Sequence, residues 1–281
     1  MLQRRATDTP VVLSIAGSDS GGGAGIQADI KSIQANGVFA ATVITAVTAQ
    51  NTREVTAAKD MPVNLVEAQF RAVWDDIRVD AIKTGMLSSS KIIEAVSRLL
   101  DKYRGDVPVV VDPVMISKSG FPLLKDDAVK TMIERLLPIA TVVTPNAHEA
   151  SRLADMEVKS VADAKEAAKK IRALGPANVL VKGGHLEDDD RAVDFLFDGE
   201  SMHVFAVPRV DSDNTHGTGC TYASAIAANL AKGYPLVKSV ERAKGYVTMA
   251  IENGIPIGSG HGPTGHFYYL RSFGRFPIED V

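Results

Sequence analysis

The sequence has 281 residues, and its 31 basic and 34 acidic residues give a formal net charge of −3 at pH 7 with histidine neutral. Hydrophobic residues make up 45% and charged residues 23% of the chain, which is typical of a folded globular protein and excludes an intrinsically disordered one. The near-neutral balance, without a cluster of Lys or Arg, argues against a surface that neutralises a nucleic-acid backbone.

The single cysteine, Cys220, cannot close an intrachain disulfide, so we expect a reducing, cytoplasmic environment. Residues 1–10 carry two arginines, but the apolar run that follows at residues 11–15 is too short for the hydrophobic part of a signal peptide. The longest weakly polar stretch, residues 38–49, is far shorter than the roughly 20 residues that a membrane helix needs. We therefore expect a protein that is neither exported nor held in a membrane.

In the first half of the chain, short β-branched runs alternate with segments of helical period. Ile26, Ile30 and Ile33 fall on one face of a helix that ends at Gly37. Strands are expected at residues 11–15, 38–47, 80–83 and 109–111, and further helices at residues 62–77 and 91–100.

The same alternation continues through the second half of the chain. Strands are expected at residues 141–143 and 178–182, helices at 148–153, 161–174, 219–231 and 235–253, and a hairpin of strands 192–197 and 203–207 around Asp198 and Gly199. This pattern predicts an α/β fold in one domain, with a mainly parallel central sheet and helices on both faces.

Polar residues follow six of the predicted strands. Any one of them is also common in an ordinary loop, but the carboxyl ends of parallel strands line the ligand crevice of such a fold. We therefore expect a site built from these six strand ends: residues 18–19, 50–51, 83–84, 112, 146–149 and 182–184.

A first glycine cluster, residues 21–25, lies between a strand and a helix. Residues 23–28 match the pattern G-x-G-x-x-A, but residues 46–53 lack the acid that holds the ribose in a dinucleotide-binding fold, which argues against an oxidoreductase. Two interpretations stay open: a flexible turn, or backbone N–H groups that approach a ligand.

A second glycine cluster, at residues 214–220, precedes a run of residues that strongly favour a helix. Gly217, Thr218 and Gly219 therefore lie at a helix N-terminus, whose free N–H groups attract anions, and we expect an oxyanion cradle there. No Lys-Ser or Lys-Thr follows, so this is not a Walker A loop. A side chain at Gly219 is expected to obstruct the anion and to require an unfavourable φ.

Cys220 falls in the first turn of the same helix, where thiol pKa values are often depressed to about 3.5 to 7.5. A thiolate there could serve as a base or a nucleophile; the alternative is a small buried thiol. His216 is either a partner of this thiol or a residue of the turn.

Taken together, these motifs closely resemble the hydroxymethylpyrimidine and phosphomethylpyrimidine kinases of thiamine biosynthesis, which belong to the ribokinase-like superfamily. The resemblance covers about residues 11–267, a single kinase domain, and leaves residues 1–10 as an N-terminal extension and 268–281 as a C-terminal tail. Its motifs lie at residues 16–29, 45–52, 83–87, 112–115, 144–150, 181–185, 216–221 and 260–263.

The resemblance implies a cytoplasmic kinase that phosphorylates the hydroxymethyl group of 4-amino-5-hydroxymethyl-2-methylpyrimidine and then adds a second phosphate. It implies ATP and Mg²⁺ as cofactors and a homodimer. Phosphoryl transfer needs mainly positioning and charge neutralisation, which a glycine-lined helix terminus, carboxylates and Lys182 can supply.

The resemblance also implies roles for individual residues. Cys220 stands where most ribokinase-like sugar kinases carry an aspartate base, and Gly217, Thr218 and Gly219 cradle the transferred group. Substrate-binding positions are Gln50, which suits an aminopyrimidine edge, with Gly17, Ala24, Asp29, Met86 and Val114 around the ring. Asn146, Glu149 and Lys182 bind ATP and its phosphates, and Asp112 and Glu149 hold the metal.

Two alternatives stay open at this point. Pyridoxal kinase has a related fold and a flat, hydroxymethyl-bearing substrate. An acyltransferase with Cys220 as nucleophile and His216 as base predicts a covalent thioester and no need for ATP.

Overall fold

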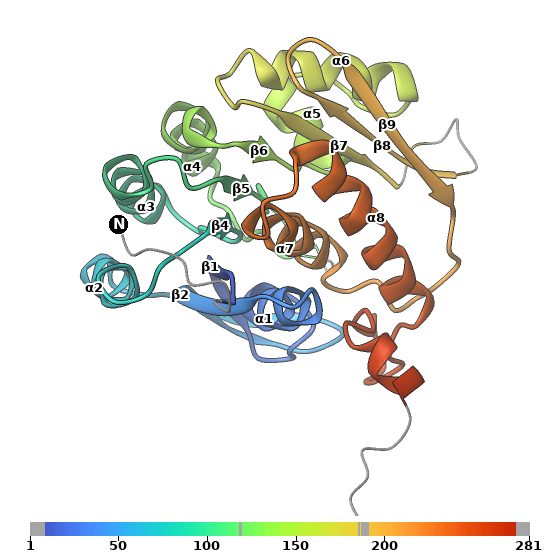
Figure 1. Cartoon of the computed structure of the whole chain (residues 1–281), viewed down its shortest axis with the longest axis horizontal. Helices are drawn as coiled ribbons and strands as arrows, with labels where there is room; N and C mark the ends of the chain where they lie inside the picture. Colours follow the sequence, from blue (N-terminus) through green and yellow to red (C-terminus); the bar gives the residue numbers. More distant parts are fainter. Residues whose placement is uncertain (1–8, 118–119, 185, 187–190, 274–281) are drawn as a thin grey trace, which may run out of the picture.

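The structure is a computed structural model that describes residues 9–117, 120–184, 186 and 191–273. Within these ranges one nine-stranded sheet has the order β3-β2-β1-β4-β5-β6-β7-β8-β9 (Figure 1). The strands are β1 (Val11–Asp19), β2 (Phe39–Gln50), β3 (Val55–Asp60), β4 (Ala81–Thr84), β5 (Val109–Val111), β6 (Val142–Val143), β7 (Val179–Gly183), β8 (Arg191–Phe197) and β9 (Met202–Pro208). The six inner strands from β2 to β7 are parallel, whereas β3, β8 and β9 are antiparallel to their neighbours.

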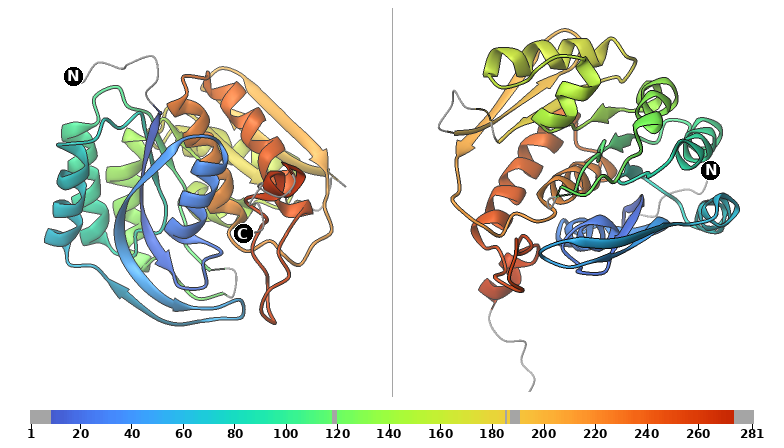
Figure 2. Two further views of the ribbon diagram at one scale, coloured as in Figure 1. Left: turned by 60° about the horizontal axis from the view of Figure 1, so that its bottom comes forward. Right: turned by 180° about the vertical axis from the view of Figure 1, so that it is seen from behind.

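Helices cover both faces of the sheet (Figure 2). They are α1 (Gly25–Ala35), α2 (Val63–Trp74), α3 (Ser90–Tyr103), α4 (Asp126–Thr131), α5 (Ala147–Ala154), α6 (Val161–Arg172), α7 (Thr218–Ala231) and α8 (Leu236–Glu252). One hydrophobic core joins the sheet to α2 through α6, and a second joins its other face to α1, α7 and α8. Strand β5 is apolar on both faces and therefore contributes to both cores: Val109 and Val111 lie in the first core and Val110 lies in the second.

The predicted fold class is confirmed, and each predicted strand and helix is present with its ends shifted by a few residues. The prediction missed β3 and α4. Strand β3 has one buried apolar residue, Val55, followed by exposed residues 56–59, so it lacks the hydrophobic run that marked the other strands. As an edge strand it is held by antiparallel pairing with β2 rather than by burial.

The parallel arrangement brings the predicted strand ends to one edge of the sheet. Asp19, Gln50 and Thr84 are the last residues of β1, β2 and β4, and Asp112 follows β5. None of the described helices is both long and apolar enough to cross a bilayer. Of the predicted N-terminal extension and C-terminal tail, residues 1–8 and 274–281 lie outside the described residues, as does residue 185 of the motif at 181–185.

Candidate active site

The two glycine clusters, far apart in the sequence, pack directly against each other. Gly217 has a φ of +79°, in the left-handed region, and a Cβ built there would lie 1.9 Å from the carbonyl oxygen of Gly23. A Cβ on Gly23 would lie 2.3 Å from Cδ2 of His216. Because neither position leaves room for a side chain, the loop before α1 and the loop before α7 form one unit.

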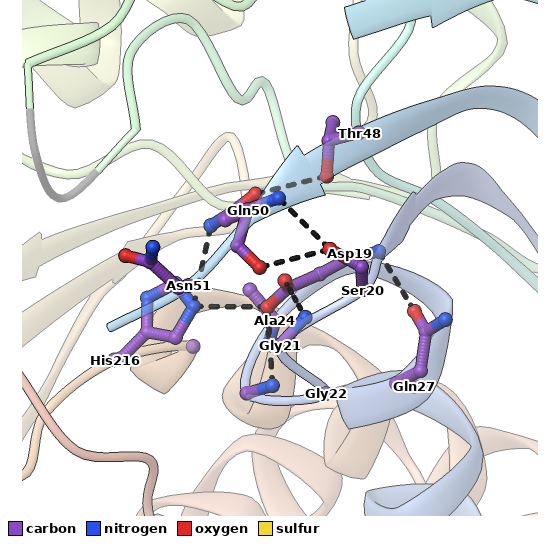
Figure 3. Close-up of polar contacts among 12 residues, drawn as sticks. Asp19, Ser20, Gly21, Gly22, Ala24, Gln27, Thr48, Gln50, Asn51 and His216 are labelled. Carbon is purple, nitrogen blue, oxygen red and sulfur yellow. Dashed lines mark hydrogen bonds and ion pairs between the residues drawn. The ribbon is translucent and has the colours of Figure 1, made fainter. Parts of the chain in front are cut away.

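Asp19 satisfies the N–H groups of the first glycine loop. Its Oδ1 accepts the N–H of Gly21 at 2.7 Å, and its Oδ2 accepts those of Gly23 at 3.1 Å and Ala24 at 2.8 Å (Figure 3). Burial opposes ionisation of this carboxyl, but hydrogen bonds from His216, Ala24 and Gly21 hold its pKa below the ordinary value. In this loop an internal carboxylate therefore takes the place in which a ligand anion would accept the N–H groups of Gly21, Gly23 and Ala24.

His216 links this carboxylate to Gln50. The Nε2 atom of His216 lies 3.0 Å from Oδ2 of Asp19 and 3.3 Å from Nε2 of Gln50, and His216 is only 8% exposed (Figure 3). The main chain of Gln50 is held by Ser20, whose hydroxyl bonds both its carbonyl and its N–H at 2.8 Å. His216 does lie in a turn, closed by the N–H of Thr218 on the carbonyl of Thr215 at 3.2 Å, and its side chain contacts Asp19 and Gln50 rather than the thiol.

The predicted cradle lies at the first turn of α7. Gly217 is the N-cap residue, and the main-chain N–H of Thr221 makes the first helical bond to its carbonyl at 2.9 Å. Helical geometry leaves the N–H groups of this turn free of intrahelical partners. A Cβ on Gly219 would lie 3.3 Å from Nζ of Lys182 and 3.6 Å from Oδ2 of Asp112. The left-handed backbone expected at Gly219 belongs to Gly217 instead, and Gly219 is constrained by space.

Lys182 and Asp112 form an ion pair beside this turn. Nζ of Lys182 lies 3.0 Å from Oδ1 of Asp112, and Thr144 donates its hydroxyl to the same oxygen at 3.3 Å. The Lys182 side chain is 14% exposed and that of Asp112 2%. Burial opposes the charge of Lys182, but Asp112 and Glu149 outweigh it and raise the lysine pKa. A cation is thus held at the edge of the anion cradle.

Asn146 and Glu149 form a capping box at the start of α5. Oδ1 of Asn146 accepts the N–H of Glu149 at 2.9 Å, and Oε2 of Glu149 accepts the N–H of Asn146 at 2.8 Å. Burial raises the pKa of Glu149 to about 7, despite the opposing charge of Lys182. This carboxylate therefore changes its charge near neutral pH.

The donor set of Asp112 and Glu149 fits a shared magnesium ion rather than a closed metal centre. Mg²⁺ prefers oxygen ligands and is usually bound by one or two carboxylates together with phosphates and waters. Across the described part of the chain, no group of three or more His, Cys, Asp or Glu side chains could hold a metal ion. Two carboxylates beside a phosphate cradle match the first arrangement.

The structure contradicts the expectation of a depressed Cys220 pKa. Cys220 is half-buried, and desolvation together with the charges of Asp29 and Asp112 raises the pKa of its thiol to about 12. The ammonium group of Lys83, whose effect exceeds that of either aspartate, and a hydrogen bond from the N–H of Gly25 lower the pKa but do not outweigh desolvation. The N-terminus of α7 alone does not set this pKa, because tertiary packing removes water from the sulfur.

A second ion pair, Lys83 with Asp29, lies fully buried beneath the thiol. Nζ of Lys83 is 2.8 Å from Oδ1 and 2.9 Å from Oδ2 of Asp29, and both side chains are 0% exposed. Ser14 and Ser224 donate their hydroxyls to the same carboxylate at 2.6 and 2.7 Å. This differs from the expectation that Asp29 contacts a substrate ring, because protein groups enclose its carboxylate.

The other predicted ring contacts lie near the packed loops. A Cβ on Gly17 would lie 2.9 Å from Sδ of Met86, and Ala24 is the half-buried N-cap of α1. Met86 also lines a cavity of about 700 Å³ together with Met115. Val114 is half-buried and follows Asp112 by two residues. Gly17 and Met86 thus lie in contact, whereas Ala24 belongs to the loop before α1 and Val114 to the loop after β5.

A C-terminal segment, which we call the strap and define as residues 258–266, bonds both the loop after β2 and the loop before α7. The N–H of His261 bonds the carbonyl of Thr52 at 2.9 Å, and the carbonyl of Gly262 accepts the N–H of His216 at 3.0 Å. Nε2 of His266 lies 2.8 Å from the hydroxyl of Thr221 in α7. The strap therefore ties the loop after β2 to the loop before α7; the motif at residues 260–263 marks this segment in the sequence, but no sequence pattern indicated these contacts.

Comparison with known proteins gives consistent findings. A family model described as phosphomethylpyrimidine kinase matches residues 19–265. A hydroxymethylpyrimidine/phosphomethylpyrimidine kinase of Streptomyces coelicolor is 51% identical over 261 residues, which cover 93% of this chain and 96% of the relative. The solved structure of Bacillus subtilis pyridoxal kinase with ADP has a TM-score of 0.87 at 39% identity, covering 94% of this chain and 99% of that one. A phosphomethylpyrimidine kinase of Clostridium difficile has a TM-score of 0.77 at 43% identity, covering 86% and 100%.

Proposed function

Because this chain belongs to the phosphomethylpyrimidine kinase family, we propose that it phosphorylates 4-amino-5-hydroxymethyl-2-methylpyrimidine and then its monophosphate, giving the diphosphate used in thiamine biosynthesis. The family resemblance found in the sequence is confirmed, and the chain is a phosphotransferase. The readings as an acyltransferase and as a dinucleotide-dependent oxidoreductase are set aside.

The observation that carries the proposal is the convergence of a helix N-terminus with a lysine and two carboxylates. Gly219 of α7 approaches both Lys182 and Asp112, and Glu149 shares their charge environment. Transfer of a phosphoryl group requires little covalent help from the protein and depends on positioned positive charge. The N–H groups of Gly219 and Cys220 in the first turn of α7 and the ammonium of Lys182 would supply that charge, whereas the N–H of Thr218 bonds the carbonyl of Thr215 at 3.2 Å.

ATP is the proposed phosphoryl donor. Lys182 would lie along its phosphates, with Asn146 and Glu149 beside them, and Asp112 and Glu149 would hold Mg²⁺. The magnesium ion would neutralise charge on the phosphates. Support for ATP comes from the ADP bound in the Bacillus subtilis structure, and support for the metal comes from the two carboxylates beside the cradle.

The pyrimidine is proposed to lie between Gln50 and Cys220, with Gly17, Ala24, Met86 and Val114 around its ring. Asp29 would act from behind this surface, through its ion pair with Lys83. In the first reaction the substrate hydroxyl oxygen bonds to the γ-phosphorus as ADP leaves, and its proton must be accepted by another group.

Cys220 is the proposed acceptor of that proton. A thiol must lose its own proton before it can act as a base, so a rate that depends on this thiolate rises with pH above neutrality. In the second reaction the nucleophile is a phosphate monoester, whose second pKa of about 6 leaves it mostly dianionic at neutral pH. That step needs no base.

The proposed function is tested with purified protein, ATP, Mg²⁺ and either the pyrimidine or pyridoxal, with products identified by mass spectrometry. We expect successive masses of the pyrimidine monophosphate and diphosphate. Pyridoxal is the second candidate substrate, because a pyridoxal kinase is similar to this chain over nearly its whole length. Pyridoxal phosphate as the sole product would contradict the proposal, and a covalent adduct on Cys220 without ATP would favour the acyltransferase.

We also propose that residues 11–267 form one kinase domain, that the chain is cytoplasmic, and that it forms a homodimer. One continuous sheet from β3 to β9 supports the first proposal, and the lone thiol of Cys220 supports the second. The homodimer rests on the family resemblance. Sedimentation equilibrium of the full chain gives its mass, and a monomer at all concentrations would contradict the last proposal.

A further inference from the structure

The hydrogen-bond network around Gln50 fixes which way its side-chain amide faces. The carboxylate of Asp19 accepts three main-chain N–H groups, and hydrogen bonds from His216, Ala24 and Gly21 outweigh burial and lower its pKa. An ionised carboxylate can only accept hydrogen bonds. The Nε2 atom of His216, 3.0 Å from Oδ2 of Asp19, must therefore carry a proton and donate it.

A donor at His216 conflicts with an amide nitrogen of Gln50 beside it. Nε2 of Gln50 lies 3.3 Å from Nε2 of His216, so this orientation sets one N–H group against another. The opposite end of the amide has the reverse conflict. The Thr48 hydroxyl lies 3.0 Å from the carbonyl oxygen of Ser18 and 3.2 Å from Oε1 of Gln50. Its single proton goes to one of these oxygens and leaves the other facing a lone pair.

A rotation of the Gln50 amide by 180° removes both conflicts at once. Its oxygen then accepts a share of the His216 N–H, and its NH₂ group donates to the Thr48 oxygen while the Thr48 proton goes to Ser18. Amide oxygen and nitrogen have nearly the same shape, so the network and not the shape decides the orientation.

We propose that His216, whose Nε2–H group is fixed by its hydrogen bond to Asp19, is a positioning residue that locks the Gln50 amide in one orientation. In that orientation the site selects a 4-aminopyrimidine over a 4-oxopyrimidine. This rests on the proposed function. One N–H and one lone pair of the amide remain for a ligand, and they match a ring nitrogen that accepts and an amino group that donates. The 4-oxo analogue presents the reverse pattern, an oxygen that accepts beside a ring N–H. An amide free to rotate would serve both edges, whereas a locked amide serves one.

Two variants test the lock from opposite ends of the amide. His216→Leu removes the donor on the oxygen side, and Thr48→Val removes the acceptor on the nitrogen side in a nearly isosteric way. Each should lower the ratio of kcat/KM for the amino substrate to that for its 4-oxo analogue, by roughly tenfold or more for His216→Leu. The loss should appear mainly as a higher KM for the amino substrate. His216→Gln, whose amide can still donate to Asp19, should recover part of the selectivity.

A double-mutant cycle separates positioning from general damage. In a Gln50→Leu background, His216→Leu should change kcat/KM little further, because the side chain that it positions is already gone. His203→Leu is the matched control, since His203 of β9 bonds Asp198, in the turn between β8 and β9, at 2.8 Å and away from the site. It should leave the substrate ratio unchanged.

The outcomes separate this inference from the proposed function. A wild-type chain that phosphorylates neither pyrimidine contradicts both. A wild-type chain that phosphorylates the amino substrate, with a ratio unchanged in both His216→Leu and Thr48→Val, contradicts the lock alone, as does an equal loss from His216→Leu with and without Gln50. The ¹⁵N NMR spectrum of the ligand-free protein gives a readout independent of activity: protonation of His216 at Nε2 supports the lock, and protonation only at Nδ1 overturns it.

Discussion

Two Lys–Asp ion pairs lie close to the first turn of α7. They differ in how far other protein groups bury and hydrogen-bond their charged atoms. In the pair of Lys83 and Asp29, both side chains are 0% exposed and two serine hydroxyls complete the carboxylate. In the pair of Lys182 and Asp112, the lysine keeps 14% of its side chain exposed and its ammonium faces the space in front of Gly219. The first pair is saturated within the protein, and the second can still bind a ligand.

The same two side-chain types, lysine and aspartate, serve stability or chemistry according to what surrounds them. A buried pair contributes little net stability compared with apolar residues, but breaking it leaves a charge without compensation. A pair at the mouth of a cradle can exchange protein contacts for phosphate oxygens. The two pairs should therefore respond differently to the same substitution.

The largest effect is expected from Lys83→Met, which leaves the Asp29 carboxylate buried without its cation. The free energy of unfolding should fall by about 3 to 5 kcal/mol, measured by urea denaturation. Adding Asp29→Asn to the same chain removes the stranded charge and should recover part of the loss. A fall of less than about 1 kcal/mol would mean that the pair is not the structural element described above.

The same substitution at the other pair should act on the reaction. Lys182→Met should lower kcat roughly 10²- to 10³-fold, the usual effect of removing one group that stabilises charge in a transition state. Its effect on unfolding should be smaller than that of Lys83→Met, because Glu149 can take up a proton once Lys182 no longer lowers its pKa. Lys238→Met, at an exposed lysine paired with Glu241, is the control and should keep the wild-type rate. Equal losses of unfolding free energy in Lys83→Met and Lys182→Met would contradict the distinction between a structural pair and a pair that acts in the reaction.

Cys220, whose thiol pKa is influenced by both pairs, gives a sharper test. Cys220→Ala should lower the rate of alcohol phosphorylation about a hundredfold, the lower end of what a general base contributes, because the thiol is mostly protonated at pH 7. The monophosphate step should change little. Single-turnover kinetics with each substrate supplied separately, at pH 7.5 and 9, distinguishes the steps. Equal losses in both, without a rise of the wild-type first step with pH, would assign Cys220 to cradle geometry instead.

The smallest effect is expected from the titration of Glu149. Its pKa of about 7 means that it must lose a proton to hold a cation. Binding of Mg²⁺ with ATP should therefore release up to one proton at pH 6.5 and almost none from this group at pH 8.5, as measured by calorimetry in buffers of different ionisation enthalpy. Glu149→Gln should abolish the difference. Proton release that persists in this variant would place the titration elsewhere.

The raised pKa of Glu149 also makes the stability of the folded chain depend on pH. Burial raises the Glu149 pKa from 4.5 to about 7, so between these values the folded chain binds a proton that the unfolded chain has lost. The contribution of this group to the free energy of unfolding therefore decreases as pH rises through that window. Stability measured across it should fall less in Glu149→Gln.

Local sequence patterns predicted much of the fold and the position of the cradle. The apolar run Val109–Val111 by itself predicted a strand. The strong helix formers after Gly219 by themselves predicted a helix N-terminus. Asp112 and Lys182 were found because parallel strands end at one edge of a sheet. These features depend on a few neighbouring residues or on a rule of the fold.

The remainder of the site depends on packing between distant segments. Asp19 and His216 are separated by 197 positions, and no periodicity links them. The raised pKa of Cys220 comes from desolvation by surrounding elements, whereas the sequence shows only its place in a first helical turn. The buried state of Asp29 likewise became evident only when Lys83, Ser14 and Ser224 were seen around it.

The strap has a consequence for how the protein is made. During synthesis from the N-terminus, Asp19 emerges 197 residues before His216, an interval of roughly 10 to 40 s at the usual rate of translation. The strap is synthesised later still, since it follows His216 in the sequence. Its Gly260 bonds Thr52, which lies 208 positions earlier. Early strands can pair while the chain grows, but the loop before α7 gains its supports only after residues 258–266 have left the ribosome. The loop before α7 therefore cannot reach the arrangement described above until residues 258–266 have been synthesised.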